Sequence, residues 1–351
     1  MADTDRLETA AAEGQVASFE DEAHGPLAKL HYFLHANPTA APLIVLLFSL
    51  AAFGVIAGER FFTPFNFSLI IQQVTVIGIL GVAQTLIIVT AGIDLSVAAI
   101  MVLSSVVMGR LGVTYGLPVG FALFAGFAVG TLCGFLNGFL ITRLRLPPFI
   151  VTLGTWSIFF ALNLWYSEAQ TVRSSDIDSI APLLKFFGER VGVFGAQFTY
   201  GSFLMIGLFG LFWYILNWTA WGRHIYAVGD DKDAAELSGI RTNRTLISVY
   251  AVAGAICALG GWIAIGRLGS VSPQSFYEGN LDAITAVVIG GCSLFGGRGS
   301  ILGTLVGALT VGVFRSGLKI AGVDVLWQEF TVGMLIIVAV ALDQWIRKVS
   351  T

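Results

Sequence analysis

The chain has 351 residues, of which 56% are hydrophobic and only 12% are charged, and its mean hydropathy is +0.83. A soluble domain usually carries about 25% charged residues, so water cannot be the only solvent of this protein. The net charge of -3 and the scattered basic residues argue against a nucleic-acid partner.

Apolar runs dominate the chain after its first 38 residues. Residues 1–38 are polar and acidic and lack the pattern of a signal peptide, so we expect a disordered cytoplasmic tail. Residues 39–348 are predicted to form one all-α integral membrane domain, because a spanning helix needs roughly 20 apolar residues and the strict alternation of a barrel is absent. About ten transmembrane helices are expected, at residues 41–58, 67–90, 94–111, 117–142, 148–167, 199–217, 244–267, 280–296, 299–318 and 325–346.

The loops between these helices differ in charge. An even number of helices places both termini on one side of the membrane, and basic residues are more frequent in the loops on that side. The positive-inside rule then predicts that both termini are cytoplasmic. The loop at 221–244 falls on the same face, whereas the long loop at 168–198 is predicted to be periplasmic.

Glycine marks two kinds of feature among the predicted helices. Gly-rich corners at residues 91–96 and 290–300 interrupt the apolar pattern, and such breaks in two halves of a membrane protein indicate a duplicated unit with the pathway between its halves. Glycines that recur every four residues lie on one side of a helix, and such a face of small residues predicts close helix packing. These faces consist of Gly126, Gly130, Gly134 and Gly138 on one helix and Gly299, Gly303 and Gly307 on another.

Polar residues inside predicted spans are candidates for a transport pathway, because each is unfavourable in lipid without a partner or a wet cavity. Most are neutral amides, which exchange hydrogen bonds with hydroxylated solutes at little desolvation cost. Hydrogen bonds between helices are the alternative interpretation, and helix capping is a second one for the two aspartates. The polar candidates are Gln72, Gln73, Gln84, Asp94, Asn137, Asn163 and Asp282, and the aromatic Trp156 is nearby.

The predicted cytoplasmic loop at 221–244 contains a short capped helix. Asp230 is predicted to cap it, the helix extends over residues 231–238, and Gly239 supplies the left-handed stop. Ala235 and Leu237 give the helix an apolar side, which suits the groove of a partner protein, although an ordinary connector is the alternative. The sequence contains no phosphate-binding Gly-x-x-x-x-Gly-Lys-Ser/Thr loop, so an ATPase, if one drives transport, must be a separate chain.

Three strings in order resemble the sugar-type permeases of bacterial ABC importers, those for ribose, xylose, arabinose, galactose, fructose and related solutes. They are residues 90–97 (TAGIDLSV), residues 222–229 (GRHIYAVG) leading to 234–240 (AAELSGI), and residues 281–291 (LDAITAVVIGG) continuing to Ser300. The resemblance covers residues 40–346, and the overall look is similar to the fructose importer permeases of alpha-proteobacteria.

The resemblance implies an ABC importer permease fold in the inner membrane and a homodimeric pore. It also implies an ATPase subunit with two cassettes in one chain and a periplasmic sugar-binding protein as partners. A coupling role would then fall on Gly222, Ala235, Glu236, Leu237 and Gly239. No enzyme active site, cofactor or metal site is predicted.

Two other functions stay open from the sequence. The first is a permease for branched-chain amino acids or other small solutes from the same broad superfamily. The second is an ion-coupled secondary carrier that uses Asp94 and Asp282 as its coupling carboxylates.

Overall fold

The long apolar runs form long helices in the computed structural model, which describes residues 40–349. Eight helical segments in this part of the chain are long and apolar enough to cross a membrane, and the all-α membrane fold is confirmed. The predicted tail at residues 1–38 lies outside the described residues. The helices that form the eight segments are α3 (Ala40–Ala57) with the turn η1 (Gly58–Arg60), α4 (Pro64–Val89), α5 (Val97–Gly109) with the π-helical η2 (Arg110–Thr114), α6 (Val119–Arg143), α7 (Pro148–Ser167), α9 (Tyr200–Trp218), α12 (Thr242–Leu268) and α14 (Ile301–Ile320).

The two other predicted spans correspond to α13 (Gly279–Ile289) and α15 (Val325–Val349). The prediction that the helix at 280–296 continues to residue 296 is wrong. It ends at Ile289 because the next segment turns sharply, with positive φ at Gly291, Gly296 and Gly297. With 11 residues, α13 is shorter than a full span. The total of about ten spans stays a prediction.

The predicted helix at 94–111 also differs from the observed one, since α5 begins three residues later, at Val97. Ala91 has a positive φ of 61°, and the segment that follows it is not helical. Asp94 accepts the backbone N–H of Ser96, which is a local alternative to helical hydrogen bonding. The corner at 90–96 is therefore a break between α4 and α5.

Side-chain caps explain where several helices begin. Thr63 accepts the N–H of Asn66 at the start of α4, with Pro64 in the first turn. Thr199 caps α9 and Ser300 caps α14 in the same way, each through an N–H three residues ahead. Each cap pairs one N–H that the helix start leaves without an internal partner.

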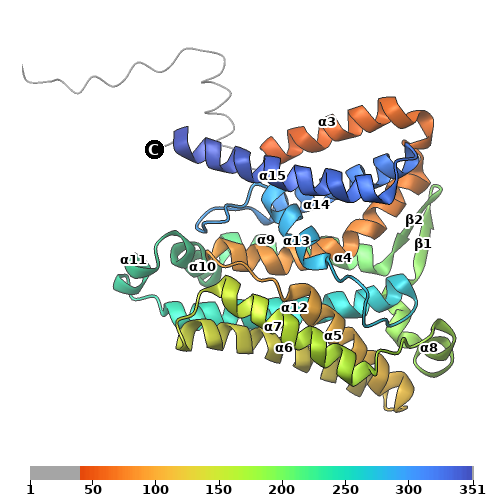
Figure 1. The fold of residues 1–351 in the computed structure, drawn as a ribbon, viewed down its shortest axis with the longest axis horizontal. Helices are drawn as coiled ribbons and strands as arrows, with labels where there is room; N and C mark the ends of the chain where they lie inside the picture. The colour runs from red at the N-terminus through yellow and green to blue at the C-terminus, as the bar shows by residue number, and fades with distance from the viewer. Residues whose placement is uncertain (1–39, 350–351) are drawn as a thin grey trace, which may run out of the picture. The chain divides into compact units, whose positions relative to one another are not determined.

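The helices pack in two groups that share α4 (Figure 1). One group contains α5, α6, α7 and α12, and the other contains α3, α13, α14 and α15. The glycine face of α6 lies against α12, where the Gly130 and Gly254 backbones touch without intervening side chains. The predicted close packing of this face is confirmed, and so is that of Gly303 and Gly307, which lie against α13.

Opposite ends of the bundle carry the two long loops (Figure 1). The predicted periplasmic loop folds into α8 (Ser174–Ile180), the helical turns η3 (Pro182–Gly188) and an antiparallel hairpin of β1 (Arg190–Val193) and β2 (Ala196–Thr199), with Val191 opposite Phe198. This hairpin is absent from the sequence prediction. The other end carries α10 (Ala220–Asp230) and α11 (Lys232–Leu237).

Candidate transport pathway and coupling surface

Gln84, Asp94 and Asn137 meet at the corner between α4 and α5. Asp94 Oδ1 accepts hydrogen bonds from Ser96 N at 2.6 Å and from Ser96 Oγ at 2.7 Å, and Asn137 Nδ2 donates to Ser96 Oγ at 2.8 Å. The Gln84 amide, in the orientation that satisfies both of its ends, donates to Asp94 O and accepts from Asp94 N. All three side chains are buried. They join α4, α6 and the corner, and in this conformation they do not face an open channel.

Two polar atoms beside this corner have no hydrogen-bond partner within the described structure. One is Asn137 Oδ1, and the other is the hydroxyl oxygen of Tyr250. Tyr250 lies so close to Gly92 that a Cβ atom on that glycine would be 2.8 Å from the hydroxyl.

Asp282 is another candidate residue, and it belongs to a charged cluster in the other helix group. Its Oδ1 accepts from Arg315 Nη2 of α14 at 2.8 Å, and the same nitrogen lies 3.3 Å from Glu329 Oε2 of α15. The capping interpretation fails here, because the carboxylate is bound by a guanidinium and α13 has no side-chain cap. We name Asp282, Arg315 and Glu329 the charged triad.

Arg267 lies at the end of α12 and is the second arginine of this region. Its Nη1 donates to the backbone oxygen of Gln73 at 3.0 Å, and its guanidinium lies 6.0 Å from the centre of the Phe276 ring. Sequence reasoning missed Arg267, Arg315 and Glu329. All three lie within predicted spans, where a charged residue is rare and mostly functional, so this signal could have found them.

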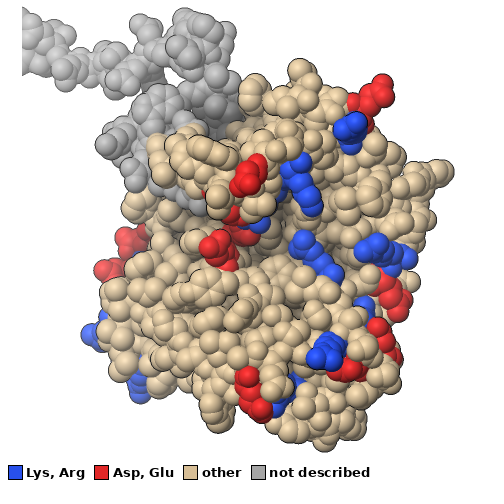
Figure 2. All heavy atoms as spheres, turned by 45° about the vertical axis from the view of Figure 1, so that its right-hand side comes forward, with Lys and Arg blue, Asp and Glu red and all other residues tan. Residues whose placement is uncertain are grey.

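Charged side chains are unevenly distributed over the surface. Figure 2 shows that, on the face in view, they gather around a hollow and along one edge, whereas most of that face is uncharged. Uncharged surface suits contact with lipid, and charge inside a membrane protein normally faces a partner or a water-filled cavity. The charged triad, which is only partly buried, fits the second description.

An aromatic cluster joins α7 to the segment before α13. The ring centres of Trp156 and Tyr277 are 5.5 Å apart, and those of Phe160 and Tyr277 are 5.1 Å apart. Asn163, one turn further along α7, donates from Nδ2 to Pro273 O at 2.7 Å and is buried. The predicted pathway residues Trp156 and Asn163 therefore both hold this segment, and Tyr277, which is half exposed, was missed.

Of the two remaining amide candidates, Gln73 accepts the hydrogen bond of Arg267 with its backbone oxygen, and Gln72 is separate from the other clusters. Its Nε2 donates to the backbone oxygen of Gln197 in β2, so it supports the hairpin. The structure therefore divides the predicted pathway residues among five places: the corner, the charged triad, the Arg267 contact, the aromatic cluster and the hairpin.

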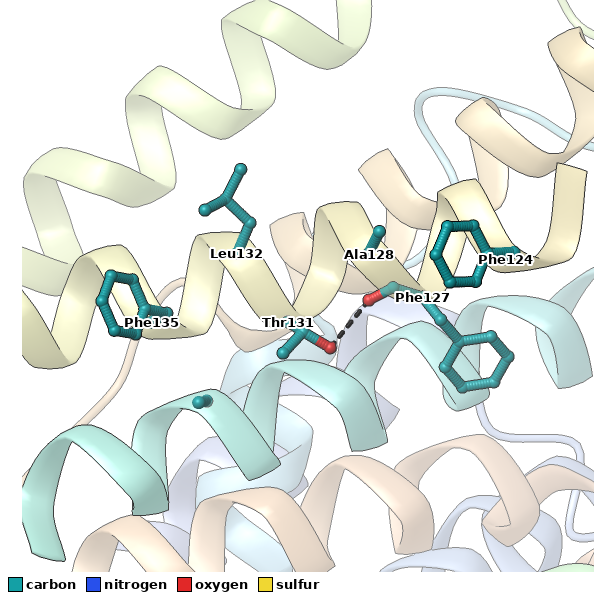
Figure 3. Close-up of a pocket in the computed structure, with 7 residues that line it drawn as sticks. Phe124, Phe127, Ala128, Thr131, Leu132 and Phe135 are labelled. Atoms are coloured by element: carbon teal, nitrogen blue, oxygen red, sulfur yellow. Dashed lines mark hydrogen bonds between the residues drawn. The ribbon is translucent and has the colours of Figure 1, made fainter. Parts of the chain in front are cut away.

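A groove between α6 and α12 does not suit a hydroxylated solute. Figure 3 shows that α6 side chains line it, and Ala251 of α12 completes it, around a volume of about 440 Å³. The lining is apolar apart from Thr131, whose hydroxyl donates within its own helix to Phe127 O at 2.8 Å. A sugar would find no free hydrogen-bonding group there, whereas a lipid chain needs none. The α6 residues are Phe124, Phe127, Ala128, Thr131, Leu132 and Phe135.

The loop at 221–244 contains two helices instead of one. Thr219 caps α10 by accepting the N–H of Gly222 at 3.1 Å. The prediction that Asp230 caps the short helix is wrong, because Asp230 ends α10 and Asp231 caps α11 through the N–H groups of residues 233 and 234. The left-handed stop at Gly239 is confirmed, with a φ of +86°.

The two predicted apolar contacts of α11 face opposite ways. Ala235 is buried and packs with Val228 and Leu246 of its own chain. Leu237, in contrast, is 91% exposed. Glu236 accepts a hydrogen bond from the hydroxyl of Thr242, which holds α11 to the start of α12. An anchored helix that presents one large apolar side chain to solvent suits contact with another protein.

Gly222, the remaining residue of this surface, sits where α10 turns away from α9. A Cβ atom there would collide with the backbone oxygens of Ile215 and Leu216. Glycine at this position therefore allows α10 to follow α9 closely. Gly222 therefore contributes to this surface by setting the path of the backbone, because it has no side chain to offer a partner.

The sequence matches one protein family and many characterised relatives. Residues 66–340 match the family described as the permease component of branched-chain amino acid transport systems. The chain is 56% identical to the fructose import permease protein of Rhizobium meliloti, over 95% of this chain and 93% of that protein. No solved structure matches it significantly.

More distant relatives differ in the solute that they are named for. The chain is 36% identical to the ribose import permease protein of Bacillus subtilis, over 85% of this chain and 90% of the relative. It is 35% identical to the D-allose transport system permease protein of Escherichia coli, over 87% and 91% of the two chains. The family match at residues 66–340 includes the loop with α10 and α11.

Proposed function

This chain belongs to the family of permease components of branched-chain amino acid transport systems, and on that premise we propose that it is the membrane-spanning subunit of an ABC importer for a monosaccharide. One observation carries the choice of solute class: the chain is 56% identical to a fructose import permease over 95% of its length. Other relatives are named for ribose and D-allose. The protein is a transporter subunit and not an enzyme.

The side chains near the proposed pathway favour a sugar over an amino acid. A sugar ring has apolar faces that stack on aromatic rings and hydroxyl groups that bond to charged or amide side chains, and the combination of aromatic lining with few polar groups is usual in ligand sites. Trp156, Phe160 and Tyr277 supply the rings. Arg267 and the charged triad supply the polar part. D-fructose is our choice of substrate.

The pathway is proposed to form between two copies of this chain. The charged triad lies on helices α13, α14 and α15, and its three side chains are each partly exposed. A second permease would cover such a surface and separate it from lipid, as an intramembrane charge requires. A homodimer is the simplest assembly, because it needs no further gene product.

The surface formed by α10 and α11 is proposed to bind a separate ATPase subunit on the cytoplasmic side. Leu237 is the apolar contact, while Ala235 and Glu236 anchor the helix beneath it. A chain with two nucleotide-binding cassettes would contact both copies of this surface. A sugar-binding protein would deliver the solute on the opposite side, where α8 and the hairpin lie.

In this mechanism the solute site itself does not need high affinity. The binding protein and the ATPase each favour one conformation of the dimer, and nucleotide binding shifts the population between outward-open and inward-open states. The solute then crosses in the direction that these partners impose. Weak binding along the path permits release into the cytoplasm.

Reconstituted vesicles test this function. The chain is inserted with the ATPase and binding protein of the same organism, and uptake of radiolabelled D-fructose is measured with ATP on the ATPase side. We expect uptake that requires ATP and the binding protein and that persists when an ionophore removes the proton gradient. Competition by unlabelled D-ribose, D-allose and L-leucine identifies the solute class.

The same assay separates the alternatives. Uptake that survives removal of the ATPase but collapses with the proton gradient would mean an ion-coupled carrier. ATP-dependent uptake of leucine with no uptake of any monosaccharide would mean an amino-acid permease. Either result would overturn the proposal.

A further inference from the structure

The last turn of α10 contacts the end of α4 and the second Gly-rich corner at once, and these contacts are made by backbone. Gly229 lies directly against the carbonyl oxygen of Val89, the last residue of α4. Gly297 donates its N–H to the same oxygen at 3.0 Å. Three segments that are far apart in sequence therefore meet at one carbonyl group.

Further contacts surround this carbonyl. A Cβ atom on Gly296 would lie 2.6 Å from Ala91 Cβ and 2.6 Å from Gly229 O, and one on Gly297 would lie 2.8 Å from Asp230 Cα. Both glycines have positive φ, of +85° and +70°, which a side chain rarely tolerates. The second corner can reach α10 this closely only because it carries glycine here.

Tyr226 adds a hydrogen bond one turn earlier on α10. Its hydroxyl donates to Gly299 O at 2.9 Å, next to Ser300, which caps α14. The side chain is partly buried, and burial raises the pKa of its hydroxyl to about 12, so the donor keeps its proton at all physiological pH values. α10 is thus joined to the residue before the cap of α14.

Each corner leads directly into a long helix. The corner at 90–96 continues into α5, and the corner at 290–300 continues into α14. The first corner also carries Asp94 and its buried network. α5 and α14 belong to different helix groups. A displacement of α10 can reach both groups, through backbone contacts of Gly229 with Val89 and of Gly296 with Ala91, and through the Tyr226 hydrogen bond to Gly299.

We infer that Tyr226 and Gly229 form a rigid joint through which α10 transmits movement of the ATPase to the starts of α5 and α14 together. Both are positioning residues that act through the corners and do not contact the solute. The joint rests on the proposed function, since it needs an ATPase at α10 and α11. It goes beyond that function by assigning the route between the ATPase surface and the two broken helices. Coupling of this kind is carried by packed contacts between elements that adopt two arrangements.

If this joint transmits movement, substitutions in it should uncouple ATP hydrolysis from solute uptake. In Tyr226→Phe the ring stays and the hydrogen bond to Gly299 is lost. In Gly229→Ala the added methyl group collides with Val89 O and forces the two segments apart. Matched controls are Tyr214→Phe on α9, where the side chain is exposed, and Gly210→Ala on the same helix, where an added Cβ atom meets no other atom within 4 Å.

The measurement is the ratio of solute taken up to ATP hydrolysed, in vesicles that contain the complete importer and receive radiolabelled D-fructose. Loss of one hydrogen bond should lower this ratio about 5-fold in Tyr226→Phe, and separation of the backbones should lower it about 10-fold or more in Gly229→Ala. ATP hydrolysis and copurification of the ATPase should persist in both variants. The two controls should keep the wild-type ratio.

Two outcomes would overturn the joint. One is a wild-type ratio in both variants. The other is a parallel fall of uptake and hydrolysis with the ratio unchanged, which a purely structural defect would produce. If the wild-type importer takes up no solute with ATP, the proposed function fails, and this result is distinct because it does not depend on any variant. A melting temperature measured for each purified variant identifies misfolding.

Discussion

Replacing Gly130 by alanine tests the close contact of α6 with α5 and α12. A Cβ atom at this position would lie 2.7 Å from Gly254 O, 2.8 Å from Ala258 Cβ and 2.8 Å from Ser104 Oγ. Carbon atoms in contact prefer a separation of about 3.5–4.0 Å, so the overlap with Ala258 is about 1 Å. Gly254 and Ala258 belong to α12, whereas Ser104 belongs to α5. A shift of α6 away from one of these helices therefore does not remove the overlap with the other.

The magnitude follows from comparison with a matched glycine. Gly154 lies inside α7 and is exposed, and an added Cβ atom there meets no other atom within 4 Å. Alanine improves helix propensity by about 1 kcal/mol at both sites, so this contribution cancels. The difference between the two variants then reports the overlap, which we expect to cost about 1–3 kcal/mol.

Thermal unfolding of the purified protein in detergent measures this difference, with tryptophan fluorescence as the signal. One kcal/mol corresponds to about 2–4 °C in chains of 150–250 residues, so Gly130→Ala should melt several degrees below Gly154→Ala. A Gly130→Ala protein that melts with Gly154→Ala or above it would show that α6 and α12 are not packed as described.

Three further predictions concern the clusters and the ATPase surface. Asn137→Ala removes the amide that donates toward Asp94 and Ser96, and it should lower stability by about 1–3 kcal/mol, seen as a lower melting temperature than in wild type. Arg315→Met leaves the Asp282 carboxylate without its cation and should reduce D-fructose uptake, whereas adding Asp282→Asn should restore part of it; a double variant as impaired as the single one would contradict the pairing. Leu237→Asp should weaken copurification of the ATPase about 10-fold or more without changing the melting temperature, since a single exposed apolar anchor often dominates an interface, and Leu237→Met is the conservative control.

The membrane helices could be predicted because their signal is strong and local. A run of about 20 apolar residues has few alternatives to a spanning helix, and eight of the expected segments meet that description in the structure. The glycine face of α6 was equally readable, because a four-residue spacing places Gly126, Gly130, Gly134 and Gly138 on one side of a helix. The family could be recognised from three short strings.

The helix ends at the corners could not be predicted to the residue. The Gly-rich corner at 290–300 is visible in the sequence, but Leu294 and Phe295 keep part of it apolar, so hydropathy alone does not place the helix end at Ile289. The helix ends there because the backbone turns at Gly291, and the sequence alone does not distinguish a glycine in a helix from one with positive φ. The late start of α5 was equally hidden, because the positive φ of Ala91 is unusual for a residue other than glycine.

The candidate site was only partly predictable because its residues meet across helices. Asp282 was chosen for its charge, but its partner Arg315 is 33 residues away, and no spacing rule links them. Arg267 and Glu329 could have been found by searching predicted spans for every charged residue. α10 was missed because its polar residues and the glycines at 222 and 229 give it the composition of a loop. Its helical structure depends on Thr219 as a cap and on packing against α9 and α12.

The corner at 90–96 leaves helical structure, and side chains of neighbouring helices pair several of its backbone groups, which bears on how the protein moves. Thr152 of α7 accepts the N–H of Leu95 at 3.2 Å and donates to Ile93 O at 3.0 Å, while Asn280 of α13 donates to Leu95 O at 3.1 Å. Irregular backbone is tolerated at membrane depth only when protein groups satisfy it in this way. These partners are neutral side chains from separate helices, and each such bond contributes only about 1 kcal/mol. A corner held by a few exchangeable hydrogen bonds can adopt a second arrangement at a free-energy cost that ATP binding can offset. A continuous helix would instead have to break its internal backbone hydrogen bonds.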